Sequence, residues 1–183
     1  SIRIMYNTHM HGMIDIETLG VTPDSTILSI GALGFNPFST EIYSEQYVYN
    51  RIILESQADR LIDESTLAWW SEQSPEARAE AFGEDNRIEL SDTLDELSRF
   101  VRKCDKIWAN GINFDIPVLE HAYIQLNKAY PWRYHNVLDT RTIYKIDPNF
   151  KKLKNNHHAL ADCLNQIEAL QSALSGFGIT KIH

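Results

Sequence analysis

The stretch HMHGMIDIETLG, residues 9–20, decides how this chain folds. Residues 9–16 form an apolar run that ends in acids, a pattern that predicts a buried β-strand. Asp15 and Glu17 are two residues apart near the end of this strand, so their side chains share one of its faces. A turn signal with Gly, Pro and Asp follows at residues 20–24. The strand therefore brings two carboxylates to one place on a sheet.

The segments around this strand predict an α/β fold with a mixed central sheet. Residues 26–35 are mostly small or β-branched, and in residues 42–53 aromatic side chains alternate with others. Both segments are therefore expected to be strands of an antiparallel meander. Further along the chain, helical spacing and capping signals alternate with short apolar strands. The first expected helix is capped by Asp63 or Ser65 and runs through Trp70. The other expected helices are 75–83, 91–101, 114–126 and 157–174, and the expected short strands are 106–109 and 134–138. The chain begins with consecutive strands and continues with alternating helices and strands, an order that favours one mixed sheet flanked by helices.

The composition is that of one globular domain. The chain has 183 residues, 43% hydrophobic and 23% charged, enough to bury roughly 70% of the unfolded surface. The formal charge of −8 argues against a broad basic face for nucleic acid. Two cysteines give neither a disulfide framework nor metal spacing. We expect a cytoplasmic protein without a membrane segment, with residues 1–8 as an extension, native or introduced, and residues 9–183 as a single domain.

Two more acids stand at points where predicted elements meet. Asp115 opens a helix directly after a strand, and Asp162 lies in the first turns of the last helix, five residues after His157. Active sites in such sheets form at the carboxyl ends of strands, so these acids could converge with Asp15 and Glu17. Converging carboxylates repel each other unless cations neutralise them, and oxygen ligands suit Mg²⁺ or Mn²⁺. Two such ions suit attack on a phosphodiester, with a histidine as general base.

Each of these signals has an alternative interpretation. His158 competes with His157 as the base, and Asp139 is a further carboxylate that is expected to cap a helix or support Arg141. The acids could also lie scattered over a structural domain. A non-catalytic nucleic-acid-binding domain is the remaining alternative from another class.

Taken together, the motifs resemble those of a known superfamily. Asp15-x-Glu17, Asp115 and His157-x-x-x-x-Asp162 are similar to the three motifs of the DEDDh 3′→5′ exonucleases, which include proofreading exonucleases and ribonuclease T. The segments Thr66-Leu67-x-Trp69-Trp70 and Asp139-x-Arg141-Thr142 are similar to the small phage and bacterial branch. The resemblance covers residues 11–172 and implies a ribonuclease H-like fold.

The resemblance also implies a set of site residues. Asp15, Glu17, Asp115 and Asp162 would hold two Mg²⁺ or Mn²⁺ ions. His157 would be the general base, and Glu17 would also contact the terminal 3′-hydroxyl of the nucleic acid. Four residues would contact the substrate: Thr18, Leu19, Trp70 and Asn113. For Leu19 a place in the core is an equal alternative. Trp69 and Trp70 are adjacent on a helix and cannot both face one partner, and Trp70 is favoured as the stacking surface.

The implied reaction is hydrolysis of nucleic acid from a free 3′ end, which releases nucleoside 5′-monophosphates. We expect a single-stranded DNA substrate, with RNA as the alternative because the metal chemistry is the same for both. The resemblance also allows for a homodimer of this chain. The lysines at 151, 152 and 154 are expected either to bind phosphates or to be solvated.

Overall fold

The computed structural model describes residues 10–183, and the expected extension at residues 1–8 lies outside this part of the chain. The strands are β1 (His11–Thr18), β2 (Ile27–Phe35), β3 (Ile42–Ile52), β4 (Arg87–Ile88), β5 (Ile107–Ala109) and β6 (Val137–Asp139). The helices are α1 (Glu64–Ser71), α2 (Pro75–Phe82), α3 (Leu90–Val101), α4 (Asp115–Gln125), α5 (Thr140–Ile146) and α6 (Ala159–Gly176), with 3₁₀ turns at Leu54–Gln57 and Tyr134–Asn136. Among the helices of this part of the chain, none is long and apolar enough to cross a membrane.

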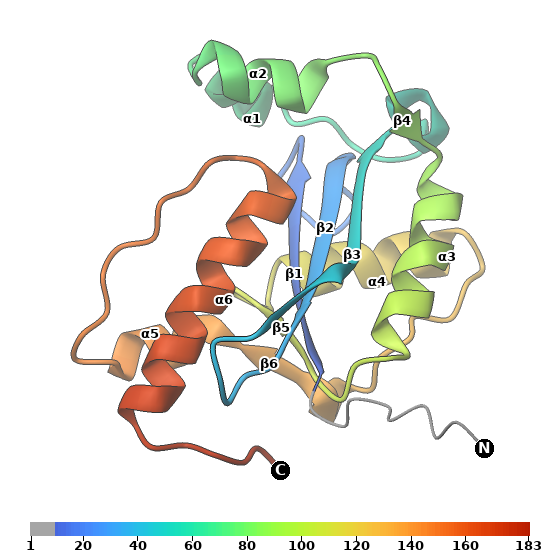
Figure 1. Ribbon diagram of the computed structural model, residues 1–183. Helices are drawn as coiled ribbons and strands as arrows, with labels where there is room; N and C mark the ends of the chain where they lie inside the picture. The colour runs from blue at the N-terminus through green and yellow to red at the C-terminus, as the bar shows by residue number, and fades with distance from the viewer. Residues whose placement is uncertain (1–9) are drawn as a thin grey trace.

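The strands form one mixed sheet in the order β4-β3-β2-β1-β5-β6. β1 pairs antiparallel with β2, and β2 with β3, which confirms the expected meander. β5 and β6 join as parallel strands on the other side of β1. β1 thus lies inside the sheet, and Figure 1 shows its carboxyl end beneath the α1–α2 pair.

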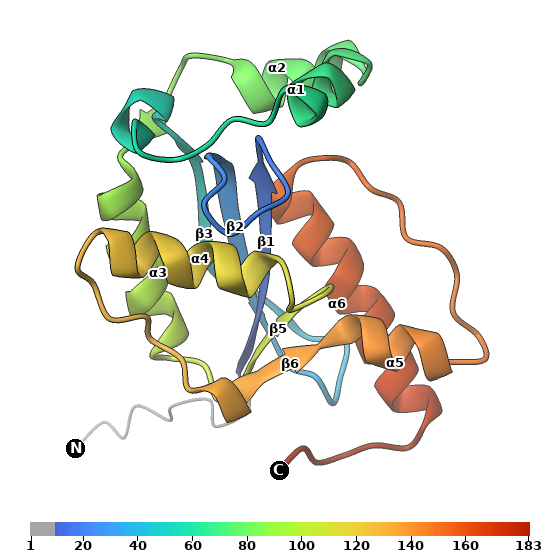
Figure 2. The same cartoon turned by 180° about the vertical axis from the view of Figure 1, so that it is seen from behind.

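Helices cover both faces of the sheet, and the alternation of β1 assigns its side chains to them. Ile14 and Ile16 pack in the core formed with α3 and α4. Met13 packs in the second core, formed with α5 and α6 (Figures 1 and 2). Since alternate residues share a face, Asp15 and Glu17 are on the α6 side of the sheet with Met13.

Most of the expected elements are confirmed, with corrections at two ends. The expected strand at 134–138 begins as a 3₁₀ turn and becomes β6 only at Val137. The last helix begins at Ala159 rather than at residue 157, because the His158 side chain accepts a hydrogen bond from the backbone N–H of Ala161 and caps it. His157 precedes the cap with a φ of 53°, in the left-handed region that non-glycine residues rarely adopt.

Gly31 in β2 permits the first turn of α6 to lie directly on the sheet. A Cβ at this position would lie 2.7 Å from the carbonyl carbon of Ala159 and 2.9 Å from the backbone nitrogen of Leu160. Gly31 is also the residue that pairs with Asp15 across the β1–β2 ladder. The lack of a side chain here therefore sets the distance between the acids of β1 and the start of α6.

A methyl group at Gly31 should push α6 away from the sheet. We expect Gly31→Ala to lower the free energy of unfolding by about 1–3 kcal/mol, as overpacking usually does, and to weaken divalent-metal binding. Chemical denaturation with and without Mg²⁺ measures both effects.

The matched control is Gly176→Ala at the other end of α6, where a Cβ would meet no atom within 4 Å. This change should leave stability unchanged or raise it by about 0.5–1 kcal/mol. Equal stability of the two variants would contradict the role given to Gly31.

Candidate active site

Three acids from two distant segments meet on the α6 side of the sheet. Asp15, Glu17 and Asp162 each offer a carboxylate oxygen, and these oxygens lie within 4.8 Å of one another. Asp115, in the first turn of α4, lines the same cavity of about 260 Å³. The structure therefore brings together all four acids that the sequence singled out.

Neighbouring backbone and side-chain groups hold two of these carboxylates in place. The backbone N–H of Asn156 donates to Asp162 at 2.8 Å, and the side-chain amide of Gln166 donates to Asp15 at 3.3 Å. Gln166 follows Asp162 by four residues, so both point from the same face of α6. The loop before α6 and its first turns thus orient the cluster.

Burial raises the pKa values of all four acids in the metal-free protein, and for three of them repulsion by neighbouring acids adds to it. Burial raises the pKa of Glu17 to about 8, and the charges of Asp162 and Asp115 add to the effect. The pKa of Asp115 also rises to about 8, mainly through burial and against the opposing charge of Arg141. Burial and the other three acids raise the pKa of Asp15 well above its ordinary range, and burial raises that of Asp162. Without metal, Glu17 and Asp115 therefore hold protons at neutral pH.

The donor set fits hard divalent cations. One oxygen of Asp15 is buried and has no hydrogen-bond partner among residues 10–183. A buried, unpartnered carboxylate oxygen is costly and indicates a missing partner. An all-oxygen set of clustered carboxylates is what Mg²⁺ and Mn²⁺ prefer. Asp15, Glu17, Asp162 and the adjacent Asp115 could hold such ions.

The two histidines before α6 have different surroundings. The ring of His157 is half-buried and packs edge-on against Trp69 and Trp70, with centroid distances of 5.1 and 5.7 Å. The ring of His158 stacks on Tyr49 at 4.5 Å and lies 3.6 Å from Glu80. His158 is therefore fixed as a cap and packing residue, whereas His157 is held by the two aromatic rings and does not itself line the acidic cavity.

The prediction that Trp70 is the stacking surface is wrong. Trp70 is 1% exposed, and its indole N–H donates to the backbone oxygen of Thr18 at 3.1 Å. Trp69 is 43% exposed instead. Helical spacing correctly separates the two rings but does not say which one faces the core.

Leu19 takes the core alternative rather than the substrate contact. It is 2% exposed, it packs with Leu28 and Trp70, and its backbone N–H is bonded to Thr26. Thr18 is also buried, and its hydroxyl donates to the backbone oxygen of Gly20. Leu19 is therefore not free to act as a wedge, whereas Thr18 lines the apolar pocket beside the acids, and its contact with substrate stays a prediction.

An apolar pocket of about 460 Å³ adjoins the acids. Val21, Trp69 and Phe114 contribute its larger apolar walls, and Ser65 and Thr66 add hydroxyl groups. Glu17 and Phe114 also line the acidic cavity, so the two hollows meet. Asn113, predicted to contact substrate, is exposed and lines neither hollow.

Sequence reasoning missed several residues of the acidic cavity. Gln166 was detectable, because it follows Asp162 at helical spacing. Arg141 stands in the segment Asp139-x-Arg141-Thr142 of the resemblance, but the place of Arg141 and Asn110 beside the acids was not predicted, because it depends on the turn after β5. The rest of the wall consists of Ile16, Asn110, Phe114, Arg141, Leu153, Lys154 and Asn155. Of these, Lys154 is one of the lysines expected either to bind phosphates or to be solvated.

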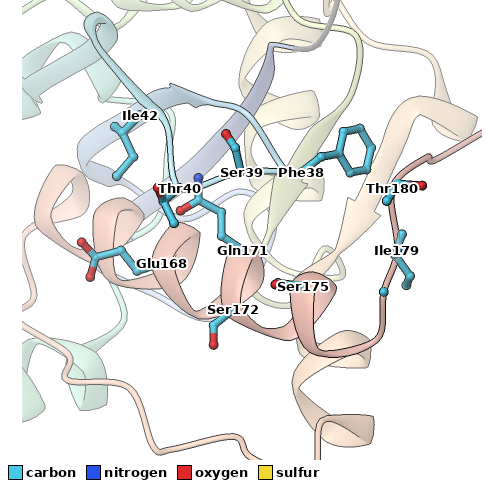
Figure 3. Close-up of a pocket in the computed structure, with 11 residues that line it drawn as sticks. Phe38, Ser39, Thr40, Ile42, Glu168, Gln171, Ser172, Ser175, Ile179 and Thr180 are labelled. Atoms are coloured by element: carbon cyan, nitrogen blue, oxygen red, sulfur yellow. The ribbon is translucent and has the colours of Figure 1, made fainter.

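A separate pocket of about 590 Å³ lies between the β2–β3 hairpin, α6 and the C-terminal segment (Figure 3). Ser39 and Thr40 come from the hairpin, and Ile179 and Thr180 come from the C-terminal segment. The pocket shares no residue with the acidic cavity. It therefore contributes nothing to the site described above.

Comparison with known proteins places the site in a family context. A family model described as the 3'-5' exoribonuclease Rv2179c-like domain matches residues 10–174. The chain is similar to the exodeoxyribonuclease of Enterobacteria phage T4, with 27% identity over 148 residues that cover 74% of this chain. It spans 63% of the length of that relative.

Solved structures share the fold. E. coli Exonuclease I in complex with a dT13 oligonucleotide matches 91% of this chain and 41% of its own, with a TM-score of 0.66 at 16% identity. S. pombe Pop2p in a Mg²⁺- and Mn²⁺-bound form matches 94% of this chain and 86% of its own, with a TM-score of 0.64 at 14% identity. The expected ribonuclease H-like fold is confirmed.

The raised pKa values predict how stability depends on pH without metal. The native protein holds protons on Glu17 and Asp115 up to about pH 8, whereas the unfolded chain releases them near pH 4 to 5. The unfolded state therefore binds fewer protons in this interval, so stability falls as pH rises from 5 to about 8. In EDTA we expect the Tm to drop by about 5 °C or more over this range, and saturating Mg²⁺ should remove most of the drop.

Two variants identify the source of the slope. Asp15→Asn should flatten the metal-free pH dependence, because it removes one charge from the cluster. Glu45→Gln, at an exposed acid on β3, should keep the wild-type slope. A pH dependence that is identical in all three proteins would show that the acids do not repel each other.

Proposed function

The chain belongs to the family of the 3'-5' exoribonuclease Rv2179c-like domain, and from this premise we propose that it is a metal-dependent 3′→5′ exonuclease. The observation that carries the proposal is the clustering of two buried and two half-buried carboxylates beside an apolar pocket. The resemblance to the DEDD exonuclease superfamily, predicted from the motifs, is confirmed by the family match and by the similar proteins and structures. A decayed, purely binding domain does not fit, because the intact acids retain their clustered geometry.

Asp15, Glu17, Asp115 and Asp162 are proposed to hold two Mg²⁺ or Mn²⁺ ions. When bound, such ions supply Lewis acidity that favours attack of water on a phosphodiester and stabilises the leaving oxygen. The protein's own part is orientation, and Gln166 and the backbone of Asn156 fix two of the carboxylates for it. His157 accepts the proton of the attacking water as general base.

The apolar pocket is proposed to hold the terminal nucleoside. Its walls include the exposed face of Trp69, and stacking of a base on an aromatic ring is sequence-tolerant. Glu17 lies at the border of the two hollows, where it can meet the terminal 3′-hydroxyl. The strand would then present its last phosphodiester to the four acids. Asn113 stays a predicted contact outside both hollows.

Two candidates remain for the sugar of the substrate. The phage T4 relative is described as an exodeoxyribonuclease and favours the expected single-stranded DNA. The family model is described as an exoribonuclease and favours RNA. The cytoplasmic location and the homodimer stay predictions that no observation of residues 10–183 tests.

Digestion of end-labelled single strands of DNA and RNA, side by side with Mg²⁺ or Mn²⁺, tests the proposal. We expect stepwise shortening from the 3′ end to 5′-monophosphates, and no reaction with a 3′-phosphate or a circular strand. His157→Ala should lower kcat by about 10²–10⁴ without loss of metal binding.

His158→Ala is the matched control. It should lower the Tm through loss of the α6 cap and the Tyr49 contact, yet it should retain most of the turnover. The opposite ranking of the two histidine variants would overturn the assignment of the base. Internal cuts or digestion of the circular strand would overturn the exonuclease itself.

The corrected tryptophan assignment gives a separate prediction. Trp69→Ala should raise KM for short single strands by roughly tenfold, since a stacked base is worth about 1–3 kcal/mol. Trp69→Phe should recover much of the loss. Trp70→Ala should instead lower the free energy of unfolding by about 3–5 kcal/mol, because it leaves a cavity in the core. Steady-state kinetics and denaturation separate the two effects, and an unchanged KM in Trp69→Ala would contradict the stacking role.

A further inference from the structure

In the described part of the chain, Arg141 is one of two cations, with Lys154, that line the acidic cavity, and its charge opposes the burial that raises the pKa of Asp115. It lies in the first turn of α5, directly after β6, and its side chain is exposed. Within residues 10–183 no carboxylate comes within 4 Å of its guanidinium group. One of its N–H groups donates to the backbone oxygen of Asn110 at 3.2 Å. Of five donors, most are therefore left for a ligand.

The position of the guanidinium group is built into the turn after β5. It lies against Gly111, where a Cβ would be 2.8 to 2.9 Å from three of its atoms. Gly111 also has a φ of 93°, which favours glycine. Asp139 joins the two segments, because one of its oxygens accepts from the backbone N–H groups of Gly111 and Arg141 at 2.9 Å each. The carboxylate of Asp139 therefore binds backbone N–H groups and does not pair with the guanidinium group of Arg141.

This arrangement suits a phosphate group. A guanidinium group that keeps its donors and has no protein carboxylate is suited to bidentate binding of a phosphate. Arg141 lines the acidic cavity but not the apolar pocket, whereas Glu17 and Phe114 line both. If the terminal base occupies the pocket, the strand passes the acids and continues on the side of Arg141. Figure 2 shows α5 starting at the end of β6, away from α1.

We propose that Arg141 binds the phosphate of the second linkage from the 3′ end, the first one that is not cleaved. This inference rests on the proposed function, because it takes the position of the terminal nucleoside from it. The contact would hold the remaining strand in register after each cleavage. It would also distinguish an oligonucleotide from a dinucleotide, which has no second linkage.

Equilibrium binding tests the contact without hydrolysis. The probe is a 5′-fluorescein single strand with a free 3′-hydroxyl, measured by anisotropy in Ca²⁺, with either a phosphodiester or an uncharged methylphosphonate at the second linkage. The wild-type protein should bind the methylphosphonate strand about tenfold more weakly, the loss of one charge-assisted contact. Arg141→Ala should bind the normal strand about tenfold more weakly and show no further loss with the methylphosphonate.

Two more variants complete the experiment. Lys145→Ala, one turn further along α5 and outside the cavity lining, should discriminate between the strands like the wild type. Gly111→Ala keeps the arginine but should displace its guanidinium group and reduce the discrimination. Arg141→Ala should also reduce the slope of log Kd against log salt by about 0.7.

The inference would be overturned if Arg141→Ala still bound the methylphosphonate strand more weakly than the normal strand. It would also be overturned if the wild-type protein bound both strands equally well. Hydrolysis of the same strand in Mg²⁺ reports on the proposed function separately. Hydrolysis without discrimination overturns only the role of Arg141. Discrimination without hydrolysis overturns only the exonuclease, and absence of strand binding overturns both.

Discussion

The desolvation of four neighbouring carboxylates, together with repulsion among them, is the constraint around which this structure is arranged. Burial and the neighbouring acids raise the pKa of Asp15 well above its ordinary range, and Glu17 and Asp115 follow to about 8. Such a cluster is unfavourable for a metal-free protein at neutral pH, because each ionised form is desolvated and repelled. The fold holds the acids together nevertheless. Divalent cations would relieve both costs, which is why the same geometry that strains the empty protein suits metal binding.

The sheet and α6 impose this cluster through close packing. β1 lies inside the sheet, so Asp15 and Glu17 cannot turn away from the α6 face without loss of the ladder on both sides. Gly31 lets the start of α6 approach the neighbouring strand, and Asp162 arrives with it. The aromatic rings of Trp69 and Trp70 pack against His157 from α1. Backbone position therefore fixes the acids, and side-chain packing fixes the histidine.

Much of this arrangement follows from the sequence because it depends on local periodicity. The period of two in β1 predicts that Asp15 and Glu17 share a face, and helical spacing places Asp162 and Gln166 together. Hydrophobic runs identify the meander and the amphipathic α3. The order of the parallel strands β5 and β6 follows from pairing between distant segments, which no local pattern reports.

The errors fall where tertiary packing decides between local equivalents. Trp69 and Trp70 have the same helix propensity, and only the position of α1 over β1 makes Trp70 the buried ring. Leu19 is buried because the turn at residues 20–26 folds back and bonds its backbone to Thr26. Arg141 lines the acidic cavity because Gly111 adopts a left-handed conformation and Asp139 accepts from the backbone N–H of Gly111, a residue 28 positions away.

The most direct test of this account is a crystal of the protein soaked in Mn²⁺ and measured at the manganese absorption edge. The account predicts anomalous density among the carboxylates of Asp15, Glu17, Asp115 and Asp162, with two peaks at full occupancy, and its loss in a crystal of Asp15→Ala. A soaked crystal with ordered carboxylates and no anomalous peak between them would contradict the account.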